Sequence, residues 1–193
     1  MKNHIITSLL YTAVTAILLG VGFPLLITGI AQVAFHQKAN GQLLAHNGQI
    51  IGSLIIGQPF TGPTYFHSRP SAAGTGYDAS SSSGSNLGPT NKTLVDRVAT
   101  SVKSESDGDP VPIDLITTSA SGLDPDISPA AALYQVPRVA HARNLSEDRV
   151  RQLVESHITP RQFGLLGESR VNVLSLNLAL DADHSGSPAM SLR

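Results

Sequence analysis

A long stretch without a single charged residue opens this chain and constrains its fold more than any other feature. It reads IITSLLYTAVTAILLGVGFPLLITGIAQVAF and covers residues 5–35. A helix needs roughly 20 apolar residues to cross the hydrocarbon core of a bilayer. We therefore predict one membrane-spanning helix at residues 5–35, preceded by a short cytoplasmic tail at residues 1–4.

A cleaved secretory signal is the main alternative for this stretch. The apolar part of such a signal is about 7 to 15 residues long and ends at a cleavage site of small residues. The sequence AQVAFHQ is a poor match to such a site, so an uncleaved anchor is favoured. Pro24 predicts a kink or weak point, because proline removes one helical hydrogen bond. The flanking charges, Lys2 and Lys38, barely discriminate the orientation.

Small residues recur every fourth position along the predicted helix. Such a row lets another membrane helix approach closely, although small residues are also common in membrane helices of any kind. Both interpretations stay open for this row, which consists of Ser8, Thr12, Ala16 and Gly20.

The charges are distributed unevenly along the chain. No Asp or Glu precedes Asp78, and the only Lys and Arg before it are Lys2, Lys38 and Arg69. This asymmetry is typical of a membrane-inserted start followed by a soluble domain. The net charge of -1 gives no bulk attraction to nucleic acid, and the absence of Cys excludes disulfides.

The remaining chain predicts an α+β domain at residues 36–181. Apolar periodicity predicts helices at residues 90–105, with a Thr or Asn cap and an apolar face, and at 144–158, where Asn144 and Glu147 have capping-box spacing. Strands are expected within residues 48–60, at VPIDLITT (111–118) and at 171–181, where leucines alternate. Residues 182–193 lack periodicity and are predicted to form a flexible tail.

A long segment without periodicity, residues 60–90, separates two of these elements. Connections longer than about 12 to 15 residues are usually functional or disordered. Its serine run at residues 80–83 suits disorder, whereas Tyr65, Phe66, Arg69 and Tyr77 are residue types that anchor interfaces. We favour an ordered binding loop, with Phe66 as an ordinary core residue being the alternative.

Motifs for catalysis or metal binding are largely absent from the sequence. It contains no GxxxxGK[ST], HExxH, GxSxG or GxGxxG motif. Asp124, Asp126 and Ser128 match the first positions of a calcium loop, but Pro129 and Gln135 stand where Gly and Glu are needed. Ser119 or Ser121 acting with His141 remains open as a catalytic arrangement. We assign no catalytic, cofactor-binding or metal-binding residue.

The stretch SGLDPDISPAAA (residues 121–132) is best explained as a loop that leads into a helix. Ser128 suits the N-cap and Pro129 the first helical position, and both aspartates would lie near the positive end of that helix.

Five blocks resemble a known family. GSLIIGQPFTGPTYFHSRPSA, YDASSSSGSNLGPTN, VPIDLITTSASGLDPDISPAAA, Gln135 with RVAHAR, and GESRVNVLSLNLALD resemble, in this order, the C subunit of the bacterial potassium-transporting P-type ATPase, the Kdp complex. Pro137, within a predicted helix, and Ser83, within a longer serine run, are local departures. The resemblance assigns three polar residues to a family motif, and these are Gln135, Arg138 and Arg143.

The resemblance implies a single-pass protein of the bacterial inner membrane with its C-terminal domain outside the cytoplasm. Its implied partners are a potassium-selective channel-like subunit, an ATP-hydrolysing subunit and a small accessory membrane peptide. The chain lacks the DKTGT sequence of P-type pumps, which fits a non-catalytic subunit of a complex that uses potassium and ATP. The loop residues predicted to contact the channel-like subunit are Tyr65, Phe66, Arg69, Pro70, Ser71, Tyr77, Asp78 and Asn86.

Two functions follow from these patterns. The favoured one is a subunit that stabilises assembly of a potassium pump, and the alternative is a membrane-anchored extracytoplasmic hydrolase or binding protein that acts alone. An additional hypothesis is that Asp124 and Asp126 raise the local potassium concentration, although salt screens exposed charges beyond about 10 Å.

Overall fold

The structure is a computed structural model that describes residues 2–46, 48–106 and 108–185. The chain forms two compact units, Met1–Leu43 and Leu44–Arg193. The boundary lies slightly after residue 36, where the sequence predicts the end of the membrane anchor. Each unit is described by itself.

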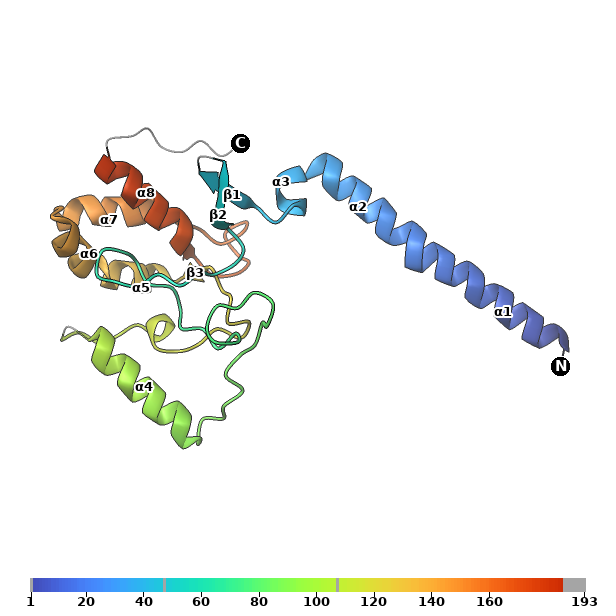
Figure 1. Cartoon of the computed structure of the whole chain (residues 1–193), viewed down its shortest axis with the longest axis horizontal. Coiled ribbons are helices and arrows are strands. Elements are labelled where there is room, and N and C mark those ends of the chain that lie inside the picture. Colours follow the sequence, from blue (N-terminus) through green and yellow to red (C-terminus); the bar gives the residue numbers. More distant parts are fainter. Residues whose placement is uncertain (1, 47, 107, 186–193) are drawn as a thin grey trace. The chain divides into compact units, whose positions relative to one another are not determined.

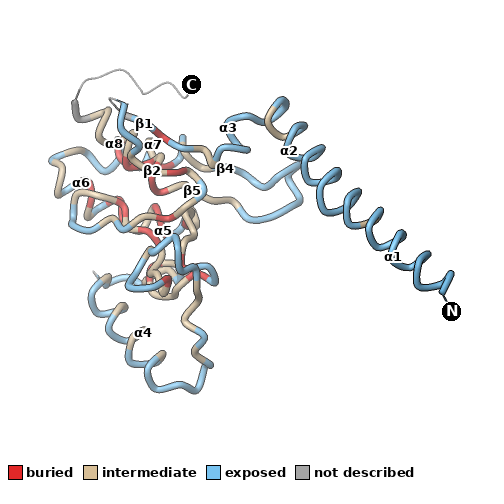
Figure 2. The backbone as a smooth tube through the Cα atoms, turned by 45° about the vertical axis from the view of Figure 1, so that its right-hand side comes forward, coloured by how far each residue is buried: buried red, intermediate tan, exposed pale blue. Residues whose placement is uncertain are grey.

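The first unit is one long apolar helix followed by a short one. The long helix runs from Lys2 to Ala34 and comprises α1 (Lys2–Ile17), the π-helical turn η1 (Leu18–Gly22) and α2 (Phe23–Ala34); α3 spans His36–Ala39. None of its described residues is buried (Figure 2). The predicted membrane helix is therefore long and apolar enough to cross a bilayer.

The π turn lies directly before Pro24. The amide of Phe23 donates to the carbonyl of Leu18, five residues back. Proline has no amide to continue the usual hydrogen-bond ladder, and local π geometry is a common adjustment at such points. The helix thus continues through Pro24 with an altered turn.

The second unit combines helices with small antiparallel sheets (Figure 1). One sheet pairs β1 (Leu43–His46) with β2 (Gln49–Ser53), and the other has the order β3 (Asp126–Ile127), β5 (Arg170–Asn172), β4 (Ile158–Thr159). Val171 lies opposite Ile127 on one side and Ile158 on the other. The helices are α4 (Lys92–Glu105), α5 (Pro129–Tyr134), α6 (Val136–Arg143), α7 (Glu147–Ser156) and α8 (Val173–Ser185), with a 3₁₀ turn η2 (Ile113–Leu115).

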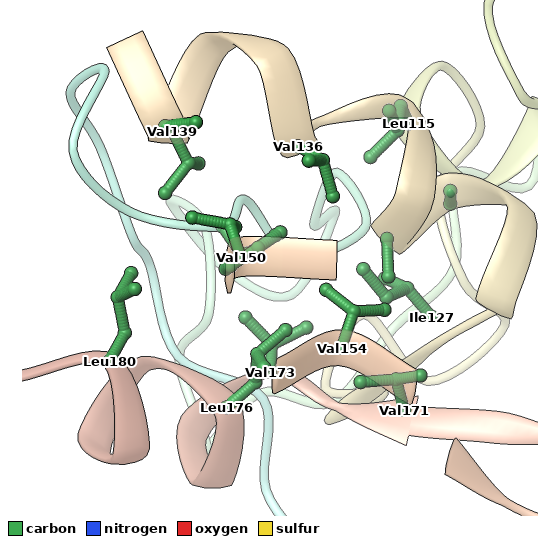
Figure 3. Close-up of a cluster of buried hydrophobic side chains, with 14 residues drawn as sticks. Leu115, Ile127, Val136, Val139, Val150, Val154, Val171, Val173, Leu176 and Leu180 are labelled. Carbon is green, nitrogen blue, oxygen red and sulfur yellow. The ribbon is translucent and has the colours of Figure 1, made fainter. Parts of the chain in front are cut away.

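The core lies among α5, α6, α7, α8 and strand β5. Helix α7 contacts α5, α6 and α8, and Figure 3 shows Val150 and Val154 of α7 facing side chains from α6 and α8. The fully buried members include Phe66, Val136, Val139, Val150, Val154, Val171, Leu176 and Leu180. Burial of these apolar side chains supplies the main stabilising contribution, about 1.5–3 kcal/mol for each one.

The predicted strand at residues 171–181 is wrong, because only β5 is extended and the chain then turns into α8. The leucine alternation also satisfies a helical pattern, since Val173, Leu176, Asn177 and Leu180 are buried at helical spacing. Leucine and alanine are better helix formers than the β-branched residues that favour strands. Tertiary packing selected the helix.

Two further predictions of extended structure are wrong or too long. Residues 111–118 contain the turn η2 instead of a strand, and within residues 48–60 only β2 is a strand. The predicted tail begins too early, because α8 continues to Ser185. The rest of that tail, residues 186–193, lies outside the described residues.

Helix ends follow the sequence signals closely, with one correction. The Asn91 side chain accepts from the amide of Thr93 at the start of α4, as predicted. The cap of α7 is Ser146 and not Asn144; Asn144 instead has a left-handed backbone, with φ of 55°, at the end of α6. Pro137 lies in the first turn of α6, where its missing amide costs nothing, so it separates α5 from α6 at Gln135.

Helix α4 forms as predicted, but it buries none of its residues. Val95 on its apolar face is 55% exposed. Its helical pattern therefore does not reflect packing into the core of this domain.

Candidate functional site

The best-defined polar arrangement holds residues 62–71 against α5, α6 and α8. These residues form no regular element, so their backbone groups need partners from elsewhere, since buried amides and carbonyls are almost always paired. Side chains from α6, from α8 and from the junction of α5 and α6 supply those partners for residues 62–67; these side chains, which we call the clamp, are Gln135, Arg138, Arg143 and Asn177.

Asn177 of α8 binds the backbone of Phe66 on both sides. Its Oδ1 accepts from the Phe66 amide at 2.9 Å, and its Nδ2 donates to the Phe66 carbonyl at 3.0 Å. Asn177 is buried. Its side-chain amide bonds to the Phe66 amide and carbonyl in the way that a neighbouring β-strand would. This bond pair fixes the position of the Phe66 ring in the core.

Gln135 does the same for the next residue. Its Oε1 accepts from the His67 amide at 2.7 Å, while its Nε2 donates to the carbonyls of His67, at 3.3 Å, and Ala131, at 3.2 Å. Gln135 is buried at the junction of α5 and α6, which the proline at position 137 separates. The break in the helix thus positions this amide.

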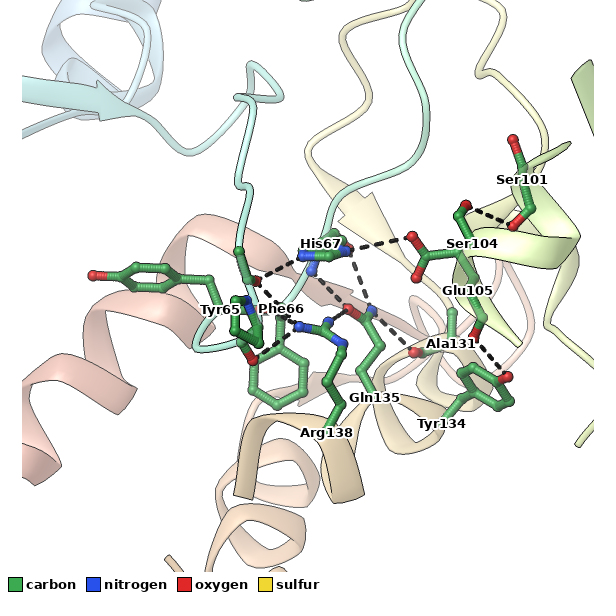
Figure 4. Close-up of polar contacts among 12 residues, drawn as sticks. Tyr65, Phe66, His67, Ser101, Ser104, Glu105, Ala131, Tyr134, Gln135 and Arg138 are labelled. Carbon is green, nitrogen blue, oxygen red and sulfur yellow. Dashed lines mark hydrogen bonds and ion pairs between the residues drawn. The ribbon is translucent and has the colours of Figure 1, made fainter. Parts of the chain in front are cut away.

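Arg138 of α6 donates hydrogen bonds to carbonyls that precede Phe66. Its Nη1 donates to Gly62, Pro63 and Tyr65 at 3.2, 2.9 and 3.0 Å. Its Nη2 donates to Gln135 Oε1 at 2.6 Å, and Figure 4 shows both side chains pointing toward the backbone of residues 65–67. Burial lowers the pKa of Arg138. A guanidinium suits this role, because its planar fork presents several donors in fixed directions.

Arg143, at the end of α6, holds the outer part of the segment. Its Nε donates to the Thr64 carbonyl at 2.6 Å, and its Nη2 pairs with Asp181 at 2.7 Å. The guanidinium lies 4.8 Å from the centre of the Tyr65 ring, within cation–π distance. The Tyr65 hydroxyl also donates to Asp181 at 3.2 Å.

His67 links the same segment to α4. Its Nδ1 lies 3.6 Å from Glu105 Oε1, and its Nε2 lies 2.9 Å from the Gly62 carbonyl. The contact with His67 and the positive charge of Arg138 lower the pKa of Glu105, although partial burial opposes this. His67, Glu105 and Tyr77 border an open depression of about 300 Å³, a volume at the lower limit of ligand pockets.

The following residues of the predicted loop are also engaged within the domain. Arg69 Nη1 donates to Asp124 at 3.2 Å, and Ser71 Oγ donates to the Gly122 carbonyl at 2.6 Å while accepting from the Tyr77 amide at 2.7 Å. The Tyr77 hydroxyl donates to the Arg69 carbonyl at 2.5 Å, and burial raises the pKa of Tyr77. Pro70 is half-buried beside them. The loop is therefore ordered.

Phe66 does not lie at a surface of this domain. Its side chain is 0% exposed and belongs to the core, which is the alternative that the sequence left open. The interface assignment of Phe66 is thus corrected, because a fully buried ring has no surface for a partner. Asp78 and Asn86 are the exposed members of the predicted interface set; Asp78 accepts from Ser80, and Asn86 has φ of 52°.

The loop before α5 has the structural role expected of it. Ser128 Oγ accepts from the Ala131 amide at 3.2 Å, which confirms the N-cap. Asp124 pairs with Arg69 and Asp126 with Arg170, while burial raises the pKa of Asp126. The arginines compensate both carboxylates, so the arrangement gives no support to potassium attraction.

The alternative catalytic arrangement also finds no geometric support. Ser119 is buried, whereas His141 is exposed on α6, and no hydrogen bond joins His141 to Ser119 or Ser121 within the described residues. Among all residues that the structure describes, no group of three His, Asp or Glu side chains is placed to hold a metal ion.

Sequence patterns alone missed several residues of this network, among them Asn177, Asp181, His67 and Glu105. Asn177 carried a signal, because it is a polar residue within the apolar run LNLAL, and a buried amide needs a hydrogen-bonding partner. Gln135, Arg138 and Arg143 were marked only by family resemblance. The structure gives them one physical task, which is to satisfy the backbone of residues 62–67.

Comparison with known proteins identifies the family to which this chain belongs. The family described as "K+-transporting ATPase, c chain" matches residues 5–182, a range that includes both the apolar helix and the network. The chain belongs to this family.

Three relatives show the extent of the similarity, and each bears the name potassium-transporting ATPase KdpC subunit. The protein of Koribacter versatilis is 64% identical over 184 residues, which is 94% of this chain and 95% of the relative. That of Acidobacterium capsulatum is 58% identical over 183 residues, covering 94% and 100%. That of Caulobacter vibrioides is 50% identical over 186 residues, covering 94% of each.

Proposed function

We propose that this chain is the C subunit of an ATP-driven potassium uptake pump and that it stabilises assembly of the complex. The observation that carries the proposal is the family match across residues 5–182, which includes both the apolar helix and the folded domain. A subunit role also fits the described site, where the arginines and buried amides are occupied with backbone groups and form no catalytic constellation. ATP hydrolysis and potassium selection would belong to other subunits.

The membrane helix is the proposed contact with the channel-like subunit. Ser8, Thr12, Ala16 and Gly20 line it at four-residue spacing. A Cβ placed on Gly20 would meet nothing within 4 Å in this chain, so the position is free for another helix. The Ser8 hydroxyl donates to the Ile5 carbonyl at 2.9 Å, so packing there would bury no unpaired donor. In the loop of residues 60–90, a contact would use the exposed Asp78 and Asn86.

Copurification from detergent tests this proposal. Gly20→Leu should reduce the yield of copurified pump subunits severalfold, because added bulk separates packed helix backbones. Gly29→Leu is the matched control, since Gly29 lies in α2 outside the four-residue row and also meets nothing within 4 Å. Equal yields from both variants would show that the row of small residues is ordinary composition.

Placement of the domain outside the cytoplasm is part of the same proposal. Protease added to intact spheroplasts should then digest the domain, whereas full protection would refute this orientation. If the parent chain leaves detergent without larger membrane partners, the alternative of a membrane-anchored hydrolase or binding protein acting alone would replace the pump subunit.

A further inference from the structure

The hairpin loop Arg161–Glu168 is the most exposed apolar feature of the described part of the second unit. It joins β4 to β5. Phe163 is 93% exposed, Leu165 82% and Leu166 60%. A cluster of three large apolar side chains at one loop tip is uncommon on a soluble surface and typically marks a contact with another molecule or a membrane.

The loop has a defined internal structure. Gln162 and Leu166 exchange two backbone hydrogen bonds of 2.9 Å each, and the amide of Gly164 donates to the Arg161 carbonyl at 3.1 Å. Phe163 has φ of 54°, a left-handed conformation that is unfavourable for a bulky residue. Because the hairpin keeps this strained residue at an exposed tip, where packing cannot compensate, the strain points to a functional role.

The tip of the hairpin is uncharged, and its charged residues lie at the base. Residues 162–167 carry no charge. At the base, Arg161 pairs with Glu168 at 2.9 Å, and Arg170 on β5 pairs with Asp126 at 3.1 Å. Four backbone hydrogen bonds within residues 161–166 pair some of the polar groups of the tip, which lowers the cost of moving those groups out of water.

The composition of the tip, with two leucines and no Trp, Tyr or Arg among residues 162–167, favours a lipid contact over a protein contact. Interface hot spots are rich in Trp, Tyr and Arg, and Leu is under-represented among them. Phe and Leu are typical of surfaces that enter the lipid interface. The chain length agrees, because only residues 35–43 connect the long helix to the second unit, a tether of at most roughly 30 Å when extended. The domain is therefore held near a bilayer surface.

We propose that the Arg161–Glu168 hairpin inserts its tip into the lipid interface as a second membrane contact of the domain. The apolar side chains would enter about 5–10 Å into the boundary between headgroups and acyl chains, with Arg161 at the level of the phosphates. This inference goes beyond the pump assignment, because it concerns lipid alone and holds on whichever side of the membrane the domain lies.

A tryptophan reporter tests the insertion directly. The sequence contains no Trp, so Phe163→Trp gives a full-length chain with one emitter. The chain is reconstituted without other subunits into phosphatidylcholine and phosphatidylglycerol vesicles that carry a spin label near the top of the acyl chains. We expect emission shifted to shorter wavelength and at least twofold quenching relative to label-free vesicles. Leu165→Trp, on the same tip, should behave alike.

Two control variants calibrate the measurement. Tyr11→Trp, within the long helix, should be quenched by lipid labels, and Ile113→Trp, at an exposed position on η2, should emit as in water without quenching. The proposal is wrong if both tip variants behave like Ile113→Trp. It is also wrong if they become shielded only when the chain is copurified with pump subunits, since the hairpin would then contact protein. Neither outcome changes the Gly20→Leu result, so the two proposals fail separately.

Discussion

Two phenylalanines in irregular segments have opposite environments in this protein. Phe66 is 0% exposed and Phe163 is 93% exposed, although neither lies in a helix or strand. The difference follows from the backbone. Asn177 bonds both the amide and the carbonyl of Phe66, whereas the hairpin around Phe163 bonds to itself. An irregular segment can enter the core only when buried side chains satisfy its polar groups.

The largest expected effect is the difference in stability between the two variants in which one of these rings is truncated. Phe66→Ala should lower the free energy of unfolding by about 3–5 kcal/mol, because it leaves a cavity in the core. Phe163→Ala should change it by no more than about 0.5 kcal/mol, as is usual for surface positions. Urea unfolding of the full chain in detergent micelles, followed by circular dichroism, measures both. Similar losses of unfolding free energy in the two variants would contradict the assignment of Phe66 to the core and of Phe163 to the surface.

The second prediction concerns Asn177, whose side-chain amide pairs with the backbone of the buried Phe66. Asn177→Leu keeps a similar volume but orphans two backbone groups, each worth about 1–3 kcal/mol when buried without a partner. We expect a loss of more than about 2 kcal/mol in the same unfolding assay. Ser175→Ala, two positions earlier on α8, is the control and should be nearly neutral, since its backbone amide keeps its bond to Asn172. An Asn177→Leu variant as stable as the parent would mean that the clamp is dispensable.

The smallest effect is a pH dependence at the edge of the clamp. The pKa of Glu105 is lowered in the folded protein, chiefly by its contact with His67. Its contribution to stability is therefore present above the unfolded value of about 4.3 and is lost as the pH falls through the folded pKa. The carboxylate is partly exposed, so we expect less than about 1 kcal/mol.

Glu105→Gln should flatten the stability profile between about pH 5 and pH 3 relative to the parent. Glu168→Gln is the matched control, because Glu168 at the base of the exposed hairpin is itself exposed and its pair is expected to add little. If the stability of Glu105→Gln falls as steeply with pH as that of the parent, the contact between His67 and Glu105 does not stabilise the fold.

The sequence predicted the local features well where one residue type has one dominant use. Asn91 and Ser128 cap helices as expected, because a side-chain oxygen at a helix start meets unpaired amides whatever surrounds it. The alternating leucines of residues 171–181 were misleading, since the same letters suit a strand face or a helix face, and only contact with α7 and β5 distinguishes the two. The role of Gln135 was equally hidden, because its partner is a backbone group far away in the sequence.

Local composition by itself determined the membrane helix, because an uncharged stretch of that length has few environments other than a bilayer, and a helix satisfies its own backbone there. The tertiary structure alone decided that Phe66 is buried and Phe163 exposed. The reason is physical: burial of a loop residue depends on whether distant side chains reach its amide and carbonyl, and no pattern of neighbouring residues contains that information.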